Sequence, residues 1–510
     1  MTAERPAAGA GRARPGDAAE SGGKCAGARG AAMGDVHDLT LLEQAAAIRR
    51  REVSPVELVE HYLARIERLD PRVGAFVTVT PDPARAAARE AERALLDRAV
   101  DVDTLPPLHG VPLAIKDLNY TAGVRTTLGS STYAEFVPMV DDFVVAVLRA
   151  AGTISVGKTN VPEFGLPCYT EPDVAPPART PWDLDRSAGG SSGGAGAAVA
   201  AGLVPAAQGS DGAGSIRIPA SACGLVGLKP ARGRISGGPL AANVTGLSVN
   251  GPLARTVRDA AALLDAMAGP MPGDPFWAPP PPPGATFLAA CERPPRALRI
   301  GRTRTPVVAD TDLHPQVVAA WEAASGLLEE LGHAVEDVPP AFTPDVVKRF
   351  ETVWSVSATL TPVDPAEDFR LRPLTRWLRA RGRAVSGPEF ARALADMQLA
   401  ARAAVAASAA YDAVLMPTLA APPARVGELR DDGDPARDFA NQKAFTPFTS
   451  VANVTGQPAV SLPLHWTADG LPVGVMLLGR PAGEAGLLSL AAQVEAARPW
   501  HERRPAVWSA

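Results

Sequence analysis

From Gly189 to Pro219 the chain reads GGSSGGAGAAVAAGLVPAAQGSDGAGSIRIP, a run very rich in small residues. Glycine at this density is typical of segments in which backbones approach closely or adopt unusual dihedral angles. The internal run AGAAVAAGL predicts a helix whose small side chains let it pack closely against its neighbours. Close approach of the backbone to neighbouring segments is therefore expected in this stretch.

Upstream of this stretch, strand and helix patterns alternate. The run HGVPLAIKDL, His109 to Leu118, is entered through Gly110 and Pro112 and has the apolar, β-branched content of a buried strand. The following DFVVAVLRAAG predicts a helix that stops near Gly152, and TISVG predicts another strand. Helices that alternate with buried strands indicate a layered α/β core.

The remaining chain extends this pattern. Apolar spacing between Leu39 and Asp70 predicts two amphipathic helices, the second with Ser54 as N-cap and Pro55 in its first turn. Helical periods dominate from Pro315 to Ala410, and DAVLMPT and PAVSLPLHW then return to strand-like runs. The segment from residue 269 to 286 contains five consecutive prolines and predicts a stiff, extended surface connection.

Composition bounds the class of protein. The chain has 510 residues, 46% of them hydrophobic, which is too apolar for wholesale disorder, and its net charge of -5 disfavours binding to nucleic acid. No apolar run is long enough for a membrane span, so no membrane association is expected. The cysteines lie far apart without a C-x-x-C pair, which disfavours zinc and disulfides and favours a reduced, cytoplasmic setting: Cys25, Cys168, Cys223 and Cys291.

The N-terminal segment differs from the rest of the chain. Residues 1–33 are rich in Ala, Gly and Arg and have almost no large apolar side chains, so they predict a disordered tail. The patterned sequence begins directly after Met33, which is therefore a candidate translation start. One domain is expected over residues 34–510.

Two familiar motifs occur but do not fit their usual contexts. Gly152 to Thr159 reads GTISVGKT and matches the phosphate-binding loop G-x-x-x-x-G-K-[ST], yet TISV has the character of the strand itself, and Pro162 follows too soon for the required helix. Gly189 to Gly193, GGSSG, matches the G-x-S-x-G elbow, but Gly/Ser-rich loops produce this pattern easily, and the histidines that follow lie in surface-like sequence. Neither ATP binding nor a catalytic histidine is predicted.

Several blocks together are more specific. GVPLAIKDL around Lys116, GGSSGG and GSDGAGSIRIP resemble the conserved segments of the amidase signature family. The similarity continues through VGKTNVPEFG, TPWDLDRSAGGSSGG, GLVGLKP, NVTGQPAVSLP and GLPVGVMLLGR, which occur in this order. It spans about residues 40 to 500 and is weakest between about 270 and 410.

The resemblance implies a single α/β/α unit with a large mixed sheet covered by helices on both faces. It also implies a hydrolase of linear carboxylic amides that acts on a small-molecule substrate without metal or organic cofactor, with a homodimer as a candidate assembly. A variable region at about 270–425 would shape the acyl pocket, with Phe350, Trp354, Phe369 and Trp377 as candidate lining residues. The alternatives are an ammonia-supplying glutaminase subunit of an amidotransferase and a non-catalytic amidase-fold binding protein.

The resemblance also assigns roles. Ser215 matches the family's nucleophile, Ser191 its bridging serine held in a cis peptide, and Lys116 its base, with Ser192 in a lesser supporting role. The chemistry of these side chains agrees, because a serine hydroxyl becomes a good nucleophile only when a neighbour takes its proton. A lysine accepts a proton only when neutral, and burial at the end of VPLAI would lower its pKa. Adjacent residues on a strand face opposite ways, so Asp117 need not keep Lys116 charged.

An attacked amide carbonyl develops negative charge that fixed donors must stabilise. In DGAGS the small residues leave backbone N–H groups unobstructed, so the amides of Gly212, Ala213, Gly214 and Ser215 are expected to converge as an oxyanion site. Asp211 and Arg217 flank these donors and are expected to brace the loop.

Overall fold

The centre of the fold is a sheet of eleven strands in the order β1-β3-β2-β4-β6-β5-β10-β11-β9-β7-β8. A computed structural model describes residues 36–510, so the predictions for residues 1–33 and for the start at Met33 lie outside the described part. Val36–Ala510 form one compact unit. The strands are β1 Phe76–Val79, β2 Pro112–Lys116, β3 Ile154–Thr159, β4 Ala206–Asp211, β5 Val226–Lys229, β6 Val249–Ala254, β7 Arg299–Arg302, β8 Ala334–Asp337, β9 Ala413–Pro417, β10 Ala459–Trp466 and β11 Pro472–Gly479.

The sheet is mixed. β2 pairs in parallel with β3 and β4, and β7 pairs in parallel with β8 and β9, whereas the other neighbouring strands are antiparallel. The predicted strands β2, β3, β9 and β10 are confirmed. Strand β8 was not predicted, because it is short, largely exposed and embedded in a stretch where helical periods dominate.

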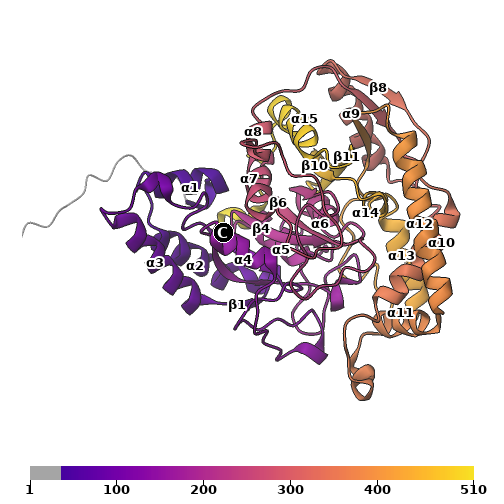
Figure 1. Ribbon diagram of the computed structural model, residues 1–510, viewed down its shortest axis with the longest axis horizontal. Coiled ribbons are helices and arrows are strands. Elements are labelled where there is room, and N and C mark those ends of the chain that lie inside the picture. Colours follow the sequence, from indigo (N-terminus) through magenta and orange to yellow (C-terminus); the bar gives the residue numbers. More distant parts are fainter. Residues whose placement is uncertain (1–35) are drawn as a thin grey trace, which may run out of the picture. The chain divides into compact units, whose positions relative to one another are not determined.

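Helices lie on both faces of the sheet, as predicted (Figure 1). They are α1 Leu41–Arg49, α2 Pro55–Val73, α3 Pro81–Leu96, α4 Phe143–Ala150, α5 Gly193–Ala200, α6 Arg217–Cys223, α7 Val257–Met267, α8 Phe287–Ala290, α9 Pro315–Glu330, α10 Pro344–Ser357, α11 Pro373–Ala384, α12 Gly387–Ala407, α13 Pro435–Phe445, α14 Ser450–Thr455 and α15 Glu484–Ala497. Among residues 36–510, every helix falls short of the length and apolarity that a membrane span requires.

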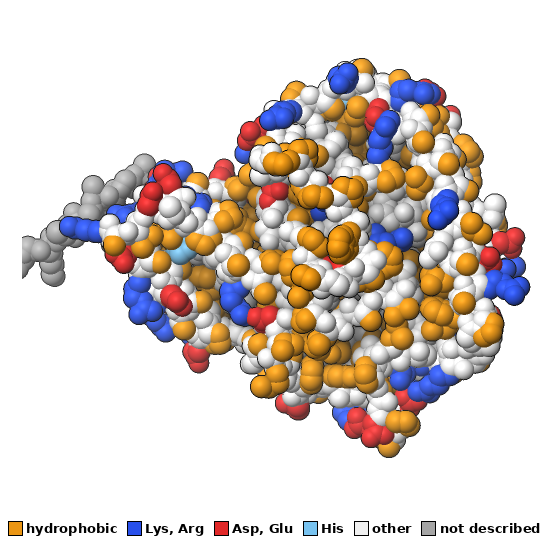
Figure 2. Space-filling view, viewed as in Figure 1, with side chains coloured by type: hydrophobic (Ala, Val, Ile, Leu, Met, Phe, Trp, Pro, Cys, Tyr) orange, Lys and Arg blue, Asp and Glu red, His pale blue; other side chains and the backbone are white. Residues whose placement is uncertain are grey.

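Local signals read from the sequence explain where several elements begin and end. The Ser54 hydroxyl accepts the N–H of Val56 at 2.9 Å, and Pro55 opens α2, so the predicted cap is confirmed. The five prolines at 279–283 lie outside helices and strands, in agreement with the predicted extended connection. Acidic and basic side chains are interspersed over the face shown in Figure 2.

Alternation along β2 assigns its side chains to two hydrophobic clusters. Leu113 and Ile115 belong to the larger cluster, which also contains residues of α7, α9 and α15, whereas Ala114 belongs to a second cluster with residues of α2, α5 and α6. Because successive side chains of a strand point to opposite faces, Lys116 shares the face of Ala114. The base predicted from the sequence is thereby directed toward the Gly/Ser-rich stretch.

The segment that matches the phosphate-binding loop is strand β3, as predicted. Lys158 is fully buried in it, and its ammonium donates to Thr126 Oγ1 at 2.9 Å and lies 3.8 Å from the carboxylate of Asp117. Burial lowers the pKa of Lys158 to about 8, although Asp117 opposes the shift. This lysine is therefore part of an internal polar network rather than a phosphate-binding loop.

Candidate active site

The sheet topology brings two strand ends together. β2 ends at Lys116 and β4 ends at Asp211, and the two strands are parallel neighbours in register at Ala114 and Ala207. Because parallel strands end at the same edge of a sheet, Lys116 lies beside the loop that follows β4. This loop carries Ser215.

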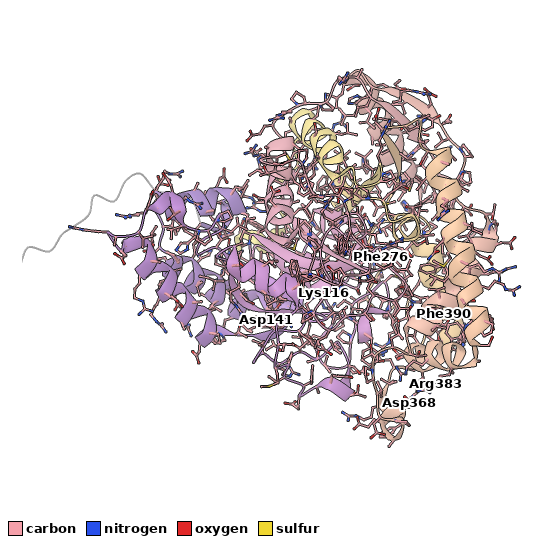
Figure 3. The ribbon with its side chains drawn as sticks, in the orientation of Figure 1. Lys116, Asp141, Phe276, Asp368, Arg383 and Phe390 are labelled. Atoms are coloured by element: carbon pink, nitrogen blue, oxygen red, sulfur yellow. The ribbon has the colours of Figure 1, made fainter. Side chains whose placement is uncertain are left out.

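Lys116 directly contacts Ser191, the predicted bridging serine. Its Nζ donates to Ser191 Oγ at 2.8 Å and to the carbonyl oxygen of Ser210 at 3.1 Å. The Lys116 side chain is fully buried, and Figure 3 labels it in the interior of the ribbon. The peptide bond between Gly190 and Ser191 is cis. The structure thus joins two of the three predicted catalytic side chains.

Burial sets the charge state of Lys116. Desolvation lowers its pKa to about 7, although the carboxylate of Asp211 partly opposes the shift. Asp117 does not counter it, because its carboxylate accepts the N–H of Thr127 at 2.8 Å and faces Lys158 instead. A substantial fraction of Lys116 is therefore neutral at pH 7 and able to accept a proton.

Backbone hydrogen bonds place Ser215 next to the Ser191–Ser192 segment. The N–H of Ser192 donates to the carbonyl oxygen of Ser215 at 3.1 Å, and the Ser192 hydroxyl donates to Ser210 O at 3.2 Å. Ser215 is 8% exposed and lines a pocket that opens to solvent. Within residues 36–510 no hydrogen bond joins the side chains of Ser191 and Ser215, and such contacts often tighten only when substrate is bound.

Close backbone approach explains the glycines around these serines. A Cβ on Gly194 would lie 2.3 Å from the backbone nitrogen of Asn160, so α5 packs directly against the chain after β3. Gly214 has φ +133°, and a Cβ there would lie 2.3 Å from Thr449 Oγ1. Ala213 does not have a positive φ, so the alanine is compatible with the loop.

One amide of the predicted oxyanion site is already engaged. The N–H of Gly214 donates to Asp211 Oδ1 at 2.7 Å, which corrects the prediction that it points toward substrate. The sequence could not show this, because the carboxylate folds back over its own loop. In the described chain no acceptor binds the N–H groups of Gly212, Ala213 or Ser215, so these three amides are the ones left to bind an oxyanion.

Asp211 and Arg217 form a buried ion pair that supports the loop between β4 and α6. Arg217 donates from Nη2 to Asp211 Oδ1 at 2.9 Å and from Nε to Oδ2 at 3.0 Å, and it also binds Thr449 O and Asn453 Oδ1. Both charged side chains are fully buried. Burial alone would raise the pKa of Asp211, but Arg217 overcomes it and holds this pKa at about 2.

Replacing Arg217 with methionine should destabilise the protein strongly. The buried carboxylate of Asp211 would lose its bidentate partner, and removing one partner of such a pair typically costs about 3–5 kcal/mol. Urea unfolding measures the loss. The double variant Asp211→Asn/Arg217→Met should lose less than the sum of the two single variants, and strict additivity would show that the pair does not support the loop.

The pocket at Ser215 has a mainly apolar wall. Its volume is about 580 Å³ including the open mouth, and Phe350, Trp354 and Phe439 line it. Phe350 and Trp354 are thus placed as predicted, but Phe369 is 73% exposed, and Trp377 packs against Phe439 outside the lining. Helical spacing alone could not separate aromatic residues that face the pocket from those that face solvent.

Several residues that organise the site were not predicted. Gln208 accepts the backbone N–H of Lys116 at 2.9 Å, and Thr449 Oγ1 donates to the Ala213 carbonyl at 2.6 Å. Asn453 Nδ2 donates to the backbone oxygen of Asp211 at 2.9 Å. Asn453 had a signal, since it opens the block NVTGQPAVSLP, whereas nothing in the local sequence marks Gln208 or Thr449.

Comparison with known proteins identifies the family of the chain. The sequence profile of the Amidase family matches residues 57–488. The 6-aminohexanoate-cyclic-dimer hydrolase of Paenarthrobacter ureafaciens is 37% identical over 489 residues, which cover 91% of this chain and 95% of that protein. The chain belongs to the amidase signature family.

Solved structures show the same fold. A 6-aminohexanoate cyclic dimer hydrolase complexed with substrate has a TM-score of 0.85 and 35% identity, and the match covers 93% of this chain and all (100%) of that one. A bacterial aryl acylamidase has a TM-score of 0.78 and 27% identity, with coverage of 91% and 97%. The protein is therefore an amidase-family hydrolase of amide C–N bonds.

Proposed function

We propose that the protein hydrolyses linear carboxylic amides to the acid and ammonia or an amine, through an acyl-enzyme on Ser215. The observation that carries the proposal is the 2.8 Å contact from a fully buried Lys116 to Ser191 Oγ, beside the loop that presents Ser215 to a pocket. An amine that is partly neutral at pH 7 and lies next to a serine pair can accept a proton from a nucleophile.

In the proposed acylation, Ser215 Oγ attacks the substrate carbonyl carbon and gives its proton to Ser191, which passes its own proton to Lys116. The amides of Gly212, Ala213 and Ser215 stabilise the oxyanion. When the C–N bond breaks, the proton returns from Lys116 through Ser191 to the leaving nitrogen. Water then attacks the ester, loses its proton by the same relay and releases the acid, so that Ser215 is restored.

The substrate range follows from the pocket rather than from the serines and the lysine. We propose that the region at about 270–425 shapes the pocket together with α13, since Phe350 and Trp354 lie on α10 and Phe439 on α13. The mainly apolar wall favours acyl groups with an aliphatic or aromatic body. Because one relative is a 6-aminohexanoate-cyclic-dimer hydrolase, cyclic amides are the main alternative to linear amides as substrates.

A panel of amides tests the function. Acetamide, hexanamide, phenylacetamide and an anilide represent linear substrates, the 6-aminohexanoate cyclic dimer represents cyclic ones, and glutamine tests the glutaminase alternative. We expect release of ammonia or amine from the larger linear amides with the highest kcat/KM. Preference for glutamine that depends on an added partner would replace this proposal with the glutaminase one, and binding without any turnover would favour the non-catalytic alternative.

The pH profile should report Lys116. Its pKa is lowered to about 7, and only the neutral amine accepts a proton, so kcat/KM should rise with pH through about 7 and level off above it. Stopped assays in buffers of constant ionic strength measure this rise of kcat/KM with pH, which is the acidic limb of the profile. Lys229 is a matched control, because burial also lowers its pKa to about 7 but its Nζ donates to Pro230 O. A limb that disappears in Lys229→Met would contradict the assignment.

A further inference from the structure

The pocket at Ser215 contains one feature that the proposed chemistry does not use. Glu351 on α10 and Lys443 on α13 are the two charged side chains in its otherwise uncharged and mainly apolar lining. Lys443 Nζ donates to Glu351 Oε1 at 2.7 Å, and the two side chains are 28% and 20% exposed. A charged pair in an apolar pocket costs desolvation, so its position beside the aromatic wall calls for an explanation.

The two partners are not equally engaged. Both carboxylate oxygens of Glu351 face a cation, because Arg381 Nη2 on α11 lies 3.8 Å from Oε2. The ammonium of Lys443 has three donors and, among the described residues, binds one acceptor, and it also lies 5.5 Å from the ring centre of Phe439. Two cations therefore surround one carboxylate, and of these two cations Lys443 lines the pocket and carries the unused donors.

Three helices fix this arrangement. α11 contacts both α10 and α13, so Glu351, Arg381 and Lys443 are held on separate rigid elements (Figure 1). On α10 the charged side chain is flanked by Phe350 and Trp354, whose stacked rings have centroids 5.6 Å apart. Because Ser215, the two rings and the charged pair line one pocket, an acyl chain bound there would lie near the charged pair.

We propose that Lys443 selects substrates whose acyl chain ends in a carboxylate, which it binds inside the pocket while Glu351 holds its ammonium in place. An anionic group would meet free donors and an excess of positive charge. A cationic group would have to compete for a carboxylate that two cations already occupy. This inference rests on the proposed function, because it names the substrate class of the same site.

The test compares charged amides with uncharged ones of similar length. The monoamides of dicarboxylic acids, from succinamate to suberamate, are each paired with the methyl-terminated amide of the same chain length. For the best pair, Lys443→Met should lower kcat/KM for the carboxylate substrate by about tenfold or more, with little change for the uncharged one, as expected for loss of a charge-assisted hydrogen bond. A purely structural role would lower both values together and would overturn the inference.

Two further variants complete the test. Glu351→Gln should leave the preference for carboxylate substrates intact or increase it, because the amide oxygen still accepts from Lys443 while the competing negative charge is removed. Loss of that preference, or a gain of amine-terminated substrates in Lys443→Met, would show that Glu351 is the selecting residue and overturn the inference. Lys348→Met removes a charge from the same helix as Glu351 but outside the pocket lining, and it should change neither substrate.

Binding separates this inference from the proposed function. Calorimetric titration of Ser215→Ala with adipate and with hexanoate needs no turnover. Tighter binding of adipate that Lys443→Met abolishes would support the inference even if no amide is hydrolysed, in which case only the proposed function fails. Equal binding of the two acids by the parent Ser215→Ala protein would contradict the inference whatever the activity.

Discussion

Ser215→Ala should lose nearly all amide hydrolysis, with kcat reduced by roughly 10³-fold or more, as is typical when a catalytic serine is removed. The hydroxyl is the proposed site of acylation, and no other hydroxyl in the described chain lies in the same loop and lines the pocket. KM should change little, because the pocket walls are retained. Steady-state assays on the best substrate of the panel measure both constants.

The neighbouring serine provides the control. The Ser192 hydroxyl donates to the carbonyl oxygen of Ser210 and does not line the pocket, so Ser192→Ala should cost far less activity than Ser215→Ala. A fluorophosphonate should label the wild-type protein and Ser192→Ala but not Ser215→Ala, with intact mass spectrometry as readout. Near-normal turnover by Ser215→Ala, or labelling at another residue, would refute the proposed nucleophile.

The sequence predicted the parts of the site that depend on short blocks and on strand alternation. β2 could be located because VPLAI is a buried run, and the opposite directions of Lys116 and Asp117 follow from strand geometry. The Gly/Ser-rich stretch predicted close packing of the backbone, and Gly194 indeed packs directly against the backbone of Asn160. These features are local, so a reading of neighbouring residues is sufficient to find them.

Contacts between distant segments could not be predicted in the same way. Asp211 was expected to brace its loop, but nothing in the sequence shows that its carboxylate takes the Gly214 amide. Thr449 and Lys443 lie more than two hundred residues after Ser215, and nothing in the sequence around them marks a contact with the site. Only the packing of α13 and α14 onto the site reveals their roles.

Lys116→Met should remove most of the turnover and yet make the folded protein more stable at neutral pH. The pKa of Lys116 is lowered to about 7 in the folded state, against about 10.4 for an unperturbed lysine. Between these values the unfolded chain binds more protons, so the lysine lowers the stability of the fold most at low pH and less as the pH rises toward 10. Methionine fills much of the same space without this cost.

Two measurements check this prediction together. kcat should fall by roughly 10³-fold, since the serine pair would lose its proton acceptor. Urea unfolding should show Lys116→Met to be more stable than wild type by a few kcal/mol near pH 7, with the difference shrinking as the pH approaches 10. A variant that is less stable at every pH would show that the lysine is a structural cation. Retained turnover would show that another base serves Ser215. Loss of activity together with a gain of stability would identify Lys116 as a buried amine that serves catalysis rather than folding.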